Sequence, residues 1–88
     1  MMAKIPQDFD ENVDLQILRT GIIAELDAIN LYEQMAAMTK NEKIKKVLLD
    51  IAREEKAHVG EFQTMLFELD KEQVKEFEEG KKEIEEME

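Results

Sequence analysis

The sequence has 88 residues and a mass of 10.3 kDa, which is enough chain for one small domain and too little for two. Its 22 acidic and 12 basic side chains give a net charge of −10, which argues against nucleic acid or an anionic membrane as a partner and leaves cationic partners, including metal ions. It contains no cysteine, so disulfides, thiol catalysis, iron–sulfur clusters and cysteine zinc sites are excluded.

The predicted elements are all helices, because no strand pattern occurs. Residues 1–11 form a predicted N-terminal arm. It has no apolar stretch of the signal-peptide kind, which predicts a cytoplasmic protein, and no run approaches the roughly 18 apolar residues of a membrane span. From about residue 11 to 38, apolar residues recur at the spacing of one helix face. These residues are Leu15, Leu18, Ile22, Ile29, Tyr32 and Ala36.

A second long helix is predicted directly after the first. Thr39 followed by Glu42 indicates a capping box at its start. An apolar stripe then continues to Leu69, which predicts a helix of about 28 residues, long for a globular protein. Two long helices joined by a short connection must lie antiparallel, so residues 12–69 are predicted to form a helical hairpin.

A third helix is predicted to start at Asp70, with Gln73 three residues later. Its apolar stripe is thin and Gly80 interrupts it, so we expect a short helix to about residue 79 and fraying beyond. Residues 70–88 are thus an acidic C-terminal helix and tail, and residues 1–88 a single all-α domain. Because an antiparallel pair leaves apolar faces open to water, the sequence predicts pairing with a second copy into a four-helix bundle.

Three polar side chains interrupt the apolar faces. Glu25 lies in the middle of the apolar face of the first helix and Glu55 in that of the second. His58, the only histidine, follows Glu55 by three residues and shares its face. A carboxylate in a core costs several kcal/mol unless something compensates it, and no Lys or Arg shares these faces. A metal ion is the remaining common compensator.

The position of these residues in the hairpin supports a shared metal site. Glu25 and Glu55 are equally far from the connection near Lys40, so they lie at the same level. One chain supplies a Glu from one helix and a Glu-x-x-His from the other, which is half the ligand set of a di-iron carboxylate bundle. A two-fold dimer would complete it, with two irons balancing the charge of four carboxylates. Such ligands suit iron or manganese and also accept zinc.

Each observation also has a plainer interpretation. A Glu-x-x-His on a helix is usually a surface pair, and a Glu in an apolar stripe is sometimes a boundary residue. Tyr32, two turns from Glu25, either fills the core or donates a hydrogen bond to a ligand carboxylate. The acidic C-terminal segment is a solvated face, or it gathers Fe²⁺ through its field.

Residues 22–35 and 52–62 carry the Glu, the Tyr and the Glu-x-x-His at spacings that together resemble the encapsulated ferritin-like family. The sequence is most similar to the ferritin-like domain fused ahead of the shell domain in some archaeal encapsulins, over roughly residues 12–75. The resemblance implies a four-helix bundle of two chains, with two irons per dimer at the interface, and dimers associated in a decameric ring.

The resemblance also implies an activity and a location. Members are ferroxidases that oxidise Fe²⁺ to Fe³⁺ with O₂, and an encapsulin shell stores the product. This places the protein in the cytoplasm, inside an encapsulin nanocompartment. Carried over by position, the iron ligands are Glu25, Glu55 and His58, and Tyr32 matches the tyrosine beside the site.

The sequence departs from the family pattern at two places. Some members have a secondary, outward metal site formed by two acids that flank the first ligand. Here those positions are Ala24 and Asp27, so we expect that site to be weakened or absent. Stand-alone members often end in a Gly/Leu-rich shell-targeting peptide, which residues 81–88 lack. Either cargo loading differs, or the chain is a piece of a longer fusion.

Two other functions stay open at this stage. A peroxide reductase resembling rubrerythrins would also use a di-iron bundle, but the absence of cysteine excludes the rubredoxin-like module that normally delivers its electrons. A non-catalytic helical assembly module would use the metal only as a structural element, and Zn²⁺ would then support its assembly as well as Fe²⁺.

Overall fold

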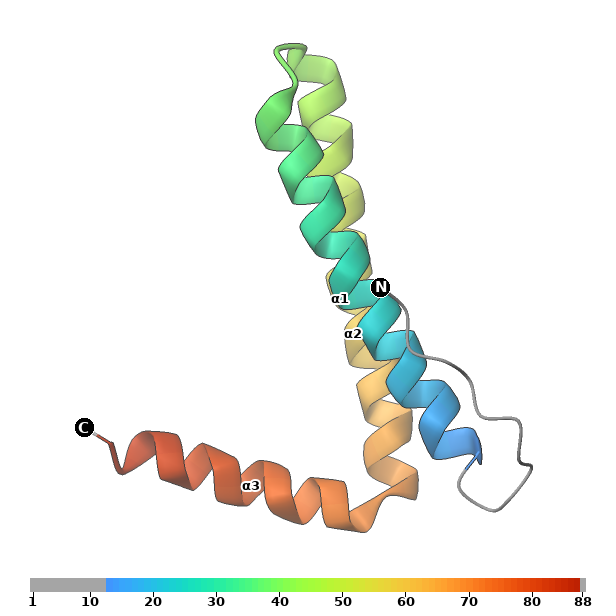
Figure 1. The fold of residues 1–88 in the computed structure, drawn as a ribbon, viewed down its shortest axis with the longest axis vertical. Coiled ribbons are helices and arrows are strands. Elements are labelled where there is room, and N and C mark those ends of the chain that lie inside the picture. Colours follow the sequence, from blue (N-terminus) through green and yellow to red (C-terminus); the bar gives the residue numbers. More distant parts are fainter. Residues whose placement is uncertain (1–12, 88) are drawn as a thin grey trace.

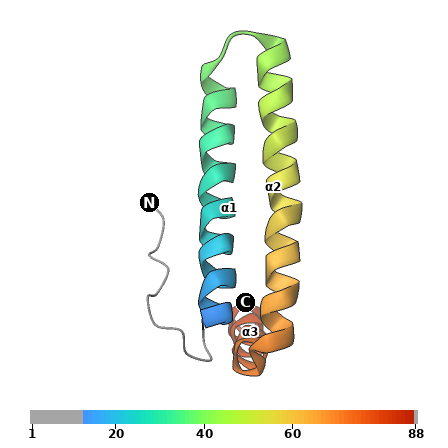
Figure 2. The ribbon, with the colours of Figure 1, turned by 90° about the vertical axis from the view of Figure 1, so that its right-hand side faces the viewer.

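The computed structural model describes residues 13–87, which form three α-helices. Helix α1 spans Val13–Met38, α2 spans Glu42–Leu69 and α3 spans Lys71–Glu85. α1 and α2 lie side by side along their length, and α3 projects from the base of the hairpin to make an L (Figure 1). A second view shows the antiparallel pair with α3 end-on below it (Figure 2). The predicted all-α fold with a helical hairpin is confirmed, and the predicted arm lies outside the described residues.

The connection between α1 and α2 is a short turn that Asn41 converts into a helix start. The Asn41 Oδ1 accepts hydrogen bonds from the backbone N–H groups of Lys43 and Ile44, both at 3.0 Å. The Thr39 hydroxyl oxygen accepts instead from the N–H of Asn41 at 3.1 Å. The predicted capping box is therefore wrong. Asn is at least as good an N-cap as Thr, and here it stands directly before Glu42, the first helical residue. The predicted helix length of about 28 residues is confirmed.

Asp70 forms the corner between α2 and α3. Its backbone N–H donates to the carbonyl of Leu66 at 2.8 Å and so closes the end of α2. Its Oδ1 accepts from the N–H of Gln73 at 3.0 Å, which confirms the predicted start of the third helix. Its Oδ2 accepts from the Arg19 guanidinium at 2.8 Å. One carboxylate therefore ties the first part of α1 to the corner that directs α3.

This corner predicts a pH-dependent stability. The hydrogen bond from Gln73 lowers the pKa of the Asp70 carboxyl most, partial burial opposes it, and the Arg19 guanidinium lowers it further, so the pKa lies below its ordinary value of 3.8. The charged form therefore stabilises the fold above the ordinary pKa, and this stabilisation is lost as the pH falls through the folded value. Asp70→Asn should lower the melting temperature by a few degrees at neutral pH and have no effect at the acid end, as followed by circular dichroism.

The matched control for Asp70 is Asp50, which pairs with Arg53 at 2.7 Å on the exposed face of α2. Because exposed pairs contribute little, Asp50→Asn should leave the melting curve nearly unchanged. A melting difference for Asp70→Asn that persists at the acid end would contradict the role given to the corner.

Helix α3 continues through Gly80 to Glu85, so the expectation of fraying beyond residue 79 is wrong. A mid-helix Gly costs about 1 kcal/mol relative to Ala. Opposite charges spaced three residues apart, as in Glu78 and Lys81, each return a few tenths of a kcal/mol, and α3 contains several such pairs. Its apolar contact with the hairpin lies near the corner, where the rings of Phe67 and Phe77 have centroids 5.4 Å apart.

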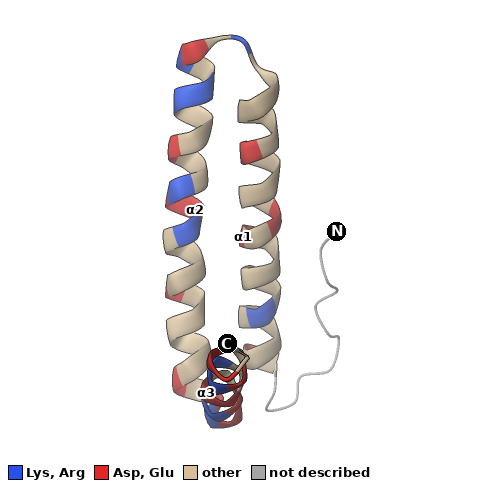
Figure 3. Ribbon diagram, turned by 90° about the vertical axis from the view of Figure 1, so that its left-hand side faces the viewer, with Lys and Arg blue, Asp and Glu red and all other residues tan. Residues whose placement is uncertain are grey.

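A single chain buries little apolar surface. The buried apolar residues of the described chain are Leu18, Ile29, Ala36, Ala52 and Leu66. Large apolar side chains on all three helices stay exposed, including Leu26 and Leu31 on α1. Charged residues are spread along α2, whereas α1 carries few (Figure 3). No helix within residues 13–87 is long and apolar enough to cross a membrane. The exposed apolar surface supports the predicted pairing with a second copy, which stays a prediction.

Candidate metal centre

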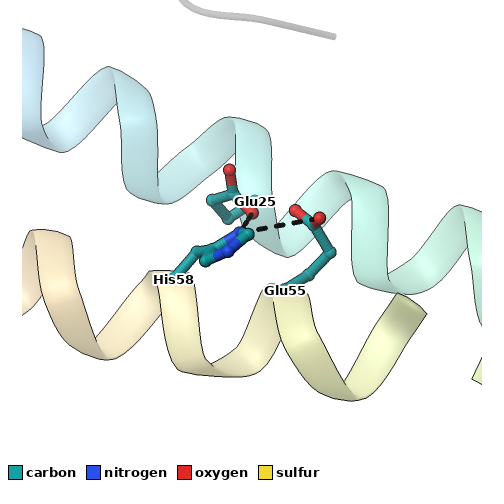
Figure 4. A group of neighbouring side chains, drawn as sticks. All are labelled: Glu25, Glu55 and His58. Carbon is teal, nitrogen blue, oxygen red and sulfur yellow. Dashed lines mark ion pairs between the residues drawn. The ribbon is translucent and has the colours of Figure 1, made fainter. Parts of the chain in front are cut away.

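Glu25, Glu55 and His58 meet between the two long helices (Figure 4). Glu25 and Glu55 each lie near the middle of their helix, α1 and α2 respectively. Glu25 reaches across from α1, while Glu55 and His58 project side by side from α2 because three residues are nearly one helical turn. Each residue offers one ligand atom, and these atoms all lie within 4.8 Å of one another. The sequence predicted this meeting because Glu25 and Glu55 are equally far from the connection, and the structure brings the three residues together.

The histidine lies between the two carboxylates. His58 Nδ1 is 3.4 Å from Glu25 Oε2 and 3.6 Å from Glu55 Oε1, which is too long for good hydrogen bonds. The carboxylate side chains are only 20% and 19% exposed, whereas that of His58 is 46% exposed. Glu25 Oε2 is buried and has no hydrogen-bond partner. A buried carboxylate oxygen without a partner is costly, so the cluster needs a compensating cation.

The nearby basic side chains do not supply that compensation. Arg53 is bound to Asp50, whose carboxylate raises the pKa of the guanidinium above its ordinary value. Lys56 lies 3.5 Å from Glu33 on the outer side, and Arg19 is engaged at the corner with Asp70. Two carboxylates and one imidazole form a donor set for a divalent iron, manganese or zinc ion, so the residues present fit a metal. Three ligands also leave coordination positions open.

Apolar layers bound the cluster along the hairpin axis. Towards the connection lie Ile29 and Ala52, which are 8% and 2% exposed. One turn the other way lie Gly21 on α1 and Phe62 on α2, and a Cβ placed on Gly21 would be 3.2 Å from the Phe62 ring. The sequence analysis missed this close approach. The available signal was a Gly four residues before Glu25 and a Phe four residues after His58.

The other predicted residues do not join the cluster within one chain. Tyr32 is half-buried on α1, and its hydroxyl has no hydrogen-bond partner among the described residues. Its predicted hydrogen bond to a ligand carboxylate therefore stays a prediction. Ala24 and Asp27 line a separate open depression of about 470 Å³ on α1. Whether Ala24 and Asp27 weaken an outward site stays a prediction.

Comparisons with known proteins match the whole hairpin and α3. The sequence profile of the rubrerythrin family, described as Rubrerythrin, matches residues 16–88. The chain is 60% identical over 73 residues to the ferritin-like-encapsulin shell fusion protein of Pyrococcus furiosus, covering 83% of this chain and 21% of that protein. It is 36% identical over 69 residues to the encapsulin nanocompartment cargo protein EncC of Myxococcus xanthus, covering 78% and 53%. The chain therefore spans about a fifth of one relative and about half of the other.

A solved structure shares the complete arrangement. The crystal structure of the encapsulated ferritin domain from Pyrococcus furiosus matches with a TM-score of 0.87 at 52% sequence identity. The match covers 96% of this chain and 86% of that one. At this coverage, the match extends over α3 as well as the hairpin.

Proposed function

The chain belongs to the rubrerythrin family as an encapsulated ferritin-like domain, and from this premise we propose that it is a ferroxidase that oxidises Fe²⁺ to Fe³⁺ with O₂. The observation that carries the proposal is the buried, unpartnered Glu25 Oε2 facing Glu55 and His58. A divalent iron ion would neutralise the negative charge that the two carboxylates bring to this site. A purely structural core would not contain such unbalanced charge.

The proposed centre is shared by two chains. One chain offers two carboxylates and one imidazole, and a two-fold copy doubles this set to four carboxylates and two imidazoles. Two ferrous ions then carry a charge of about +4 against about −4 from the carboxylates. The exposed apolar residues of α1 supply a surface for such a pairing. Association of these dimers into a decameric ring stays a prediction from the family resemblance.

Each residue has a distinct part in the proposed reaction. Glu25, Glu55 and His58 would hold the iron: the two carboxylates would offset its charge, and the His58 of each chain would supply one imidazole nitrogen. Two Fe²⁺ substrates lose one electron each, and O₂ takes up both electrons with two protons to reach the level of H₂O₂. The apolar layers above and below limit water at the site. Tyr32 is proposed to donate a hydrogen bond to a ligand carboxylate once the second copy is in place.

We also propose that the domain works inside an encapsulin nanocompartment in the cytoplasm. The support is the nature of the two relatives, one a fusion with an encapsulin shell and the other an encapsulin cargo protein. The chain spans only part of either relative. Its association with an encapsulin shell is therefore part of this proposal. The acidic surface would favour the arrival of cations such as Fe²⁺.

The match to the rubrerythrin family keeps peroxide reduction as a second candidate. These 88 residues contain no cysteine, and so no rubredoxin-like iron site to deliver electrons. Sustained turnover with H₂O₂, faster than with O₂ on the diferrous protein, would favour the peroxide reductase over the ferroxidase.

Metal stoichiometry tests the shared centre directly. Native mass spectrometry after anaerobic loading with Fe²⁺ should give two irons for every two chains, in species built from dimers. This follows because each chain carries half of the ligand set. One ion in a monomer, or dimers without metal, would mean that Glu25, Glu55 and His58 do not form this centre.

A further inference from the structure

Gly21 and Phe62 form a close contact one helical turn from the metal centre. Gly21 precedes Glu25 by four residues on α1, and Phe62 follows His58 by four on α2. A Cβ at Gly21 would lie 3.2 Å from Cε1 and Cζ of the Phe62 ring and 3.3 Å from its Cδ1. The ring therefore occupies the space that a side chain at position 21 would need.

The glycine is present for space and not for backbone freedom. Within residues 13–87 no glycine has a positive φ, and Gly21 lies in the interior of α1. A glycine there costs helix stability relative to alanine. Gly60 and Gly80 differ, because a Cβ at either would meet nothing within 4 Å. Of the three glycines in the described helices, Gly21 is therefore the one whose missing side chain makes room for a neighbouring ring.

The position of this contact gives it a bearing on the metal ligands. Side chains on a helix lean towards its N-terminus, so Phe62 leans along α2 towards the turn that carries His58. The three ligands come from two helices, so their mutual distances depend on the separation of α1 and α2 at this level. On the far side, the packed Ile29 and Ala52 fix that separation. On the near side, the contact between Gly21 and Phe62 does so.

We propose that Phe62, seated on Gly21, is a positioning residue of the metal centre. Its ring holds α1 and α2 at the separation at which Glu25 reaches an ion bound by Glu55 and His58. The ring acts through the two helices and needs no contact with the ion. Metal sites tolerate only about 0.5 Å of displacement, so a few tenths of an ångström at this layer matter. The inference rests on the metal centre of the proposed function.

The test is Gly21→Ala, with Co²⁺ as the probe ion. The added methyl group must displace the ring or the helix, so we expect Co²⁺ affinity to fall about tenfold by calorimetric titration. The visible spectrum at saturating Co²⁺ should also change, which a loss of stability alone would not produce. Gly60→Ala is the matched control, since it adds the same methyl group in open space. It should leave the affinity and the spectrum unchanged.

A second substitution should rescue the first. Leucine lacks Cε1 and Cζ, two of the three ring atoms that the new methyl group would meet, so Gly21→Ala with Phe62→Leu should recover affinity to within about threefold. A helical Gly21→Ala variant with the affinity and spectrum of the parent would overturn the proposal, as would a double variant no better than the single one.

Two further outcomes are decisive. If Gly21→Ala does not fold, Phe62→Leu alone decides. It should weaken Co²⁺ binding about threefold at unchanged helicity, and unchanged binding would overturn the proposal. If the parent protein binds no Co²⁺, or if the Glu55→Gln variant binds Co²⁺ as tightly as the parent, the proposed metal centre is refuted. The positioning role is then refuted with it. Parent binding that Gly21→Ala leaves intact overturns the positioning role alone.

Discussion

Replacing Glu55 by glutamine should reduce Fe²⁺ oxidation to the rate of a protein-free solution, a loss of at least about 100-fold. Glutamine keeps the shape of the side chain but removes the negative charge that would offset a ferrous ion, and it replaces one of the two carboxylate oxygens with an amide NH₂ that cannot bind a cation. Glu55 is largely buried beside Glu25 and His58, so no other described carboxylate can take its place. Stopped-flow absorbance after mixing the anaerobic Fe²⁺-loaded protein with O₂ measures the rate.

The adjacent residue provides the control for Glu55. Glu54 has the same charge on the same helix turn but is exposed and lies outside the cluster. Glu54→Gln therefore changes the net charge equally and should oxidise Fe²⁺ like the parent. Fast oxidation by Glu55→Gln, above the protein-free blank, would refute the assignment of the site.

Removal of metal should weaken the association of the two chains by about 10⁴-fold. In the proposed dimer without metal, four carboxylates would crowd at the interface and repel, so some must take up protons or the dimer must loosen. An ion at a free concentration of 100 times its Kd contributes about 2.7 kcal/mol to the bound state, or about 5 kcal/mol for two sites. Sedimentation velocity in chelator and in anaerobic Fe²⁺, over a range of protein concentrations, measures the difference.

The Glu55→Gln variant tests this second prediction further, because it should change the association constant in the direction opposite to that expected from a general loss of stability. With one carboxylate per chain neutral, repulsion falls, so the variant should associate more tightly than the parent in chelator and respond little to Fe²⁺. Identical sedimentation of the parent in both conditions would show that metal and assembly are not coupled. Assembly with Zn²⁺ but no turnover with Fe²⁺ would instead favour the non-catalytic helical module.

The meeting of Glu25, Glu55 and His58 was predictable because its determinants are local. The spacing from Glu55 to His58 sets a shared helix face, and the equal distances of Glu25 and Glu55 from the connection set a shared level. Only the antiparallel geometry was needed in addition. The same reasoning predicted Asp70 as a helix start, because its hydrogen bond to Gln73 spans three residues. Periodicity and the antiparallel geometry therefore accounted for the hairpin and for its candidate site, and capping accounted for the start of α3.

The features that could not be predicted depend on choices between near-equal alternatives or on distant contacts. Thr39 and Asn41 are both good caps, and the turn geometry decided between them. The pair of Arg19 with Asp70 joins residues 51 positions apart, which no periodic pattern encodes. The seating of Phe62 on Gly21 depends on how the helices rotate against each other, and face patterns alone leave that rotation undefined.

The corner at Asp70 sets the direction in which α3 leaves the hairpin. Helix α3 has 15 residues and so extends about 22 Å from that point. A change of about 10° in the angle at Asp70 would move the C-terminal end of α3 by about 4 Å, which is most of the pitch of a helix. The far end carries Ile84 and Met87, both largely exposed. In a closed arrangement of identical copies, every copy repeats the same angle, so an angular error would accumulate around the circuit. In an assembly in which α3 contacted neighbouring copies, the carboxylate that joins Arg19 to Gln73 would therefore help to set the angle between them.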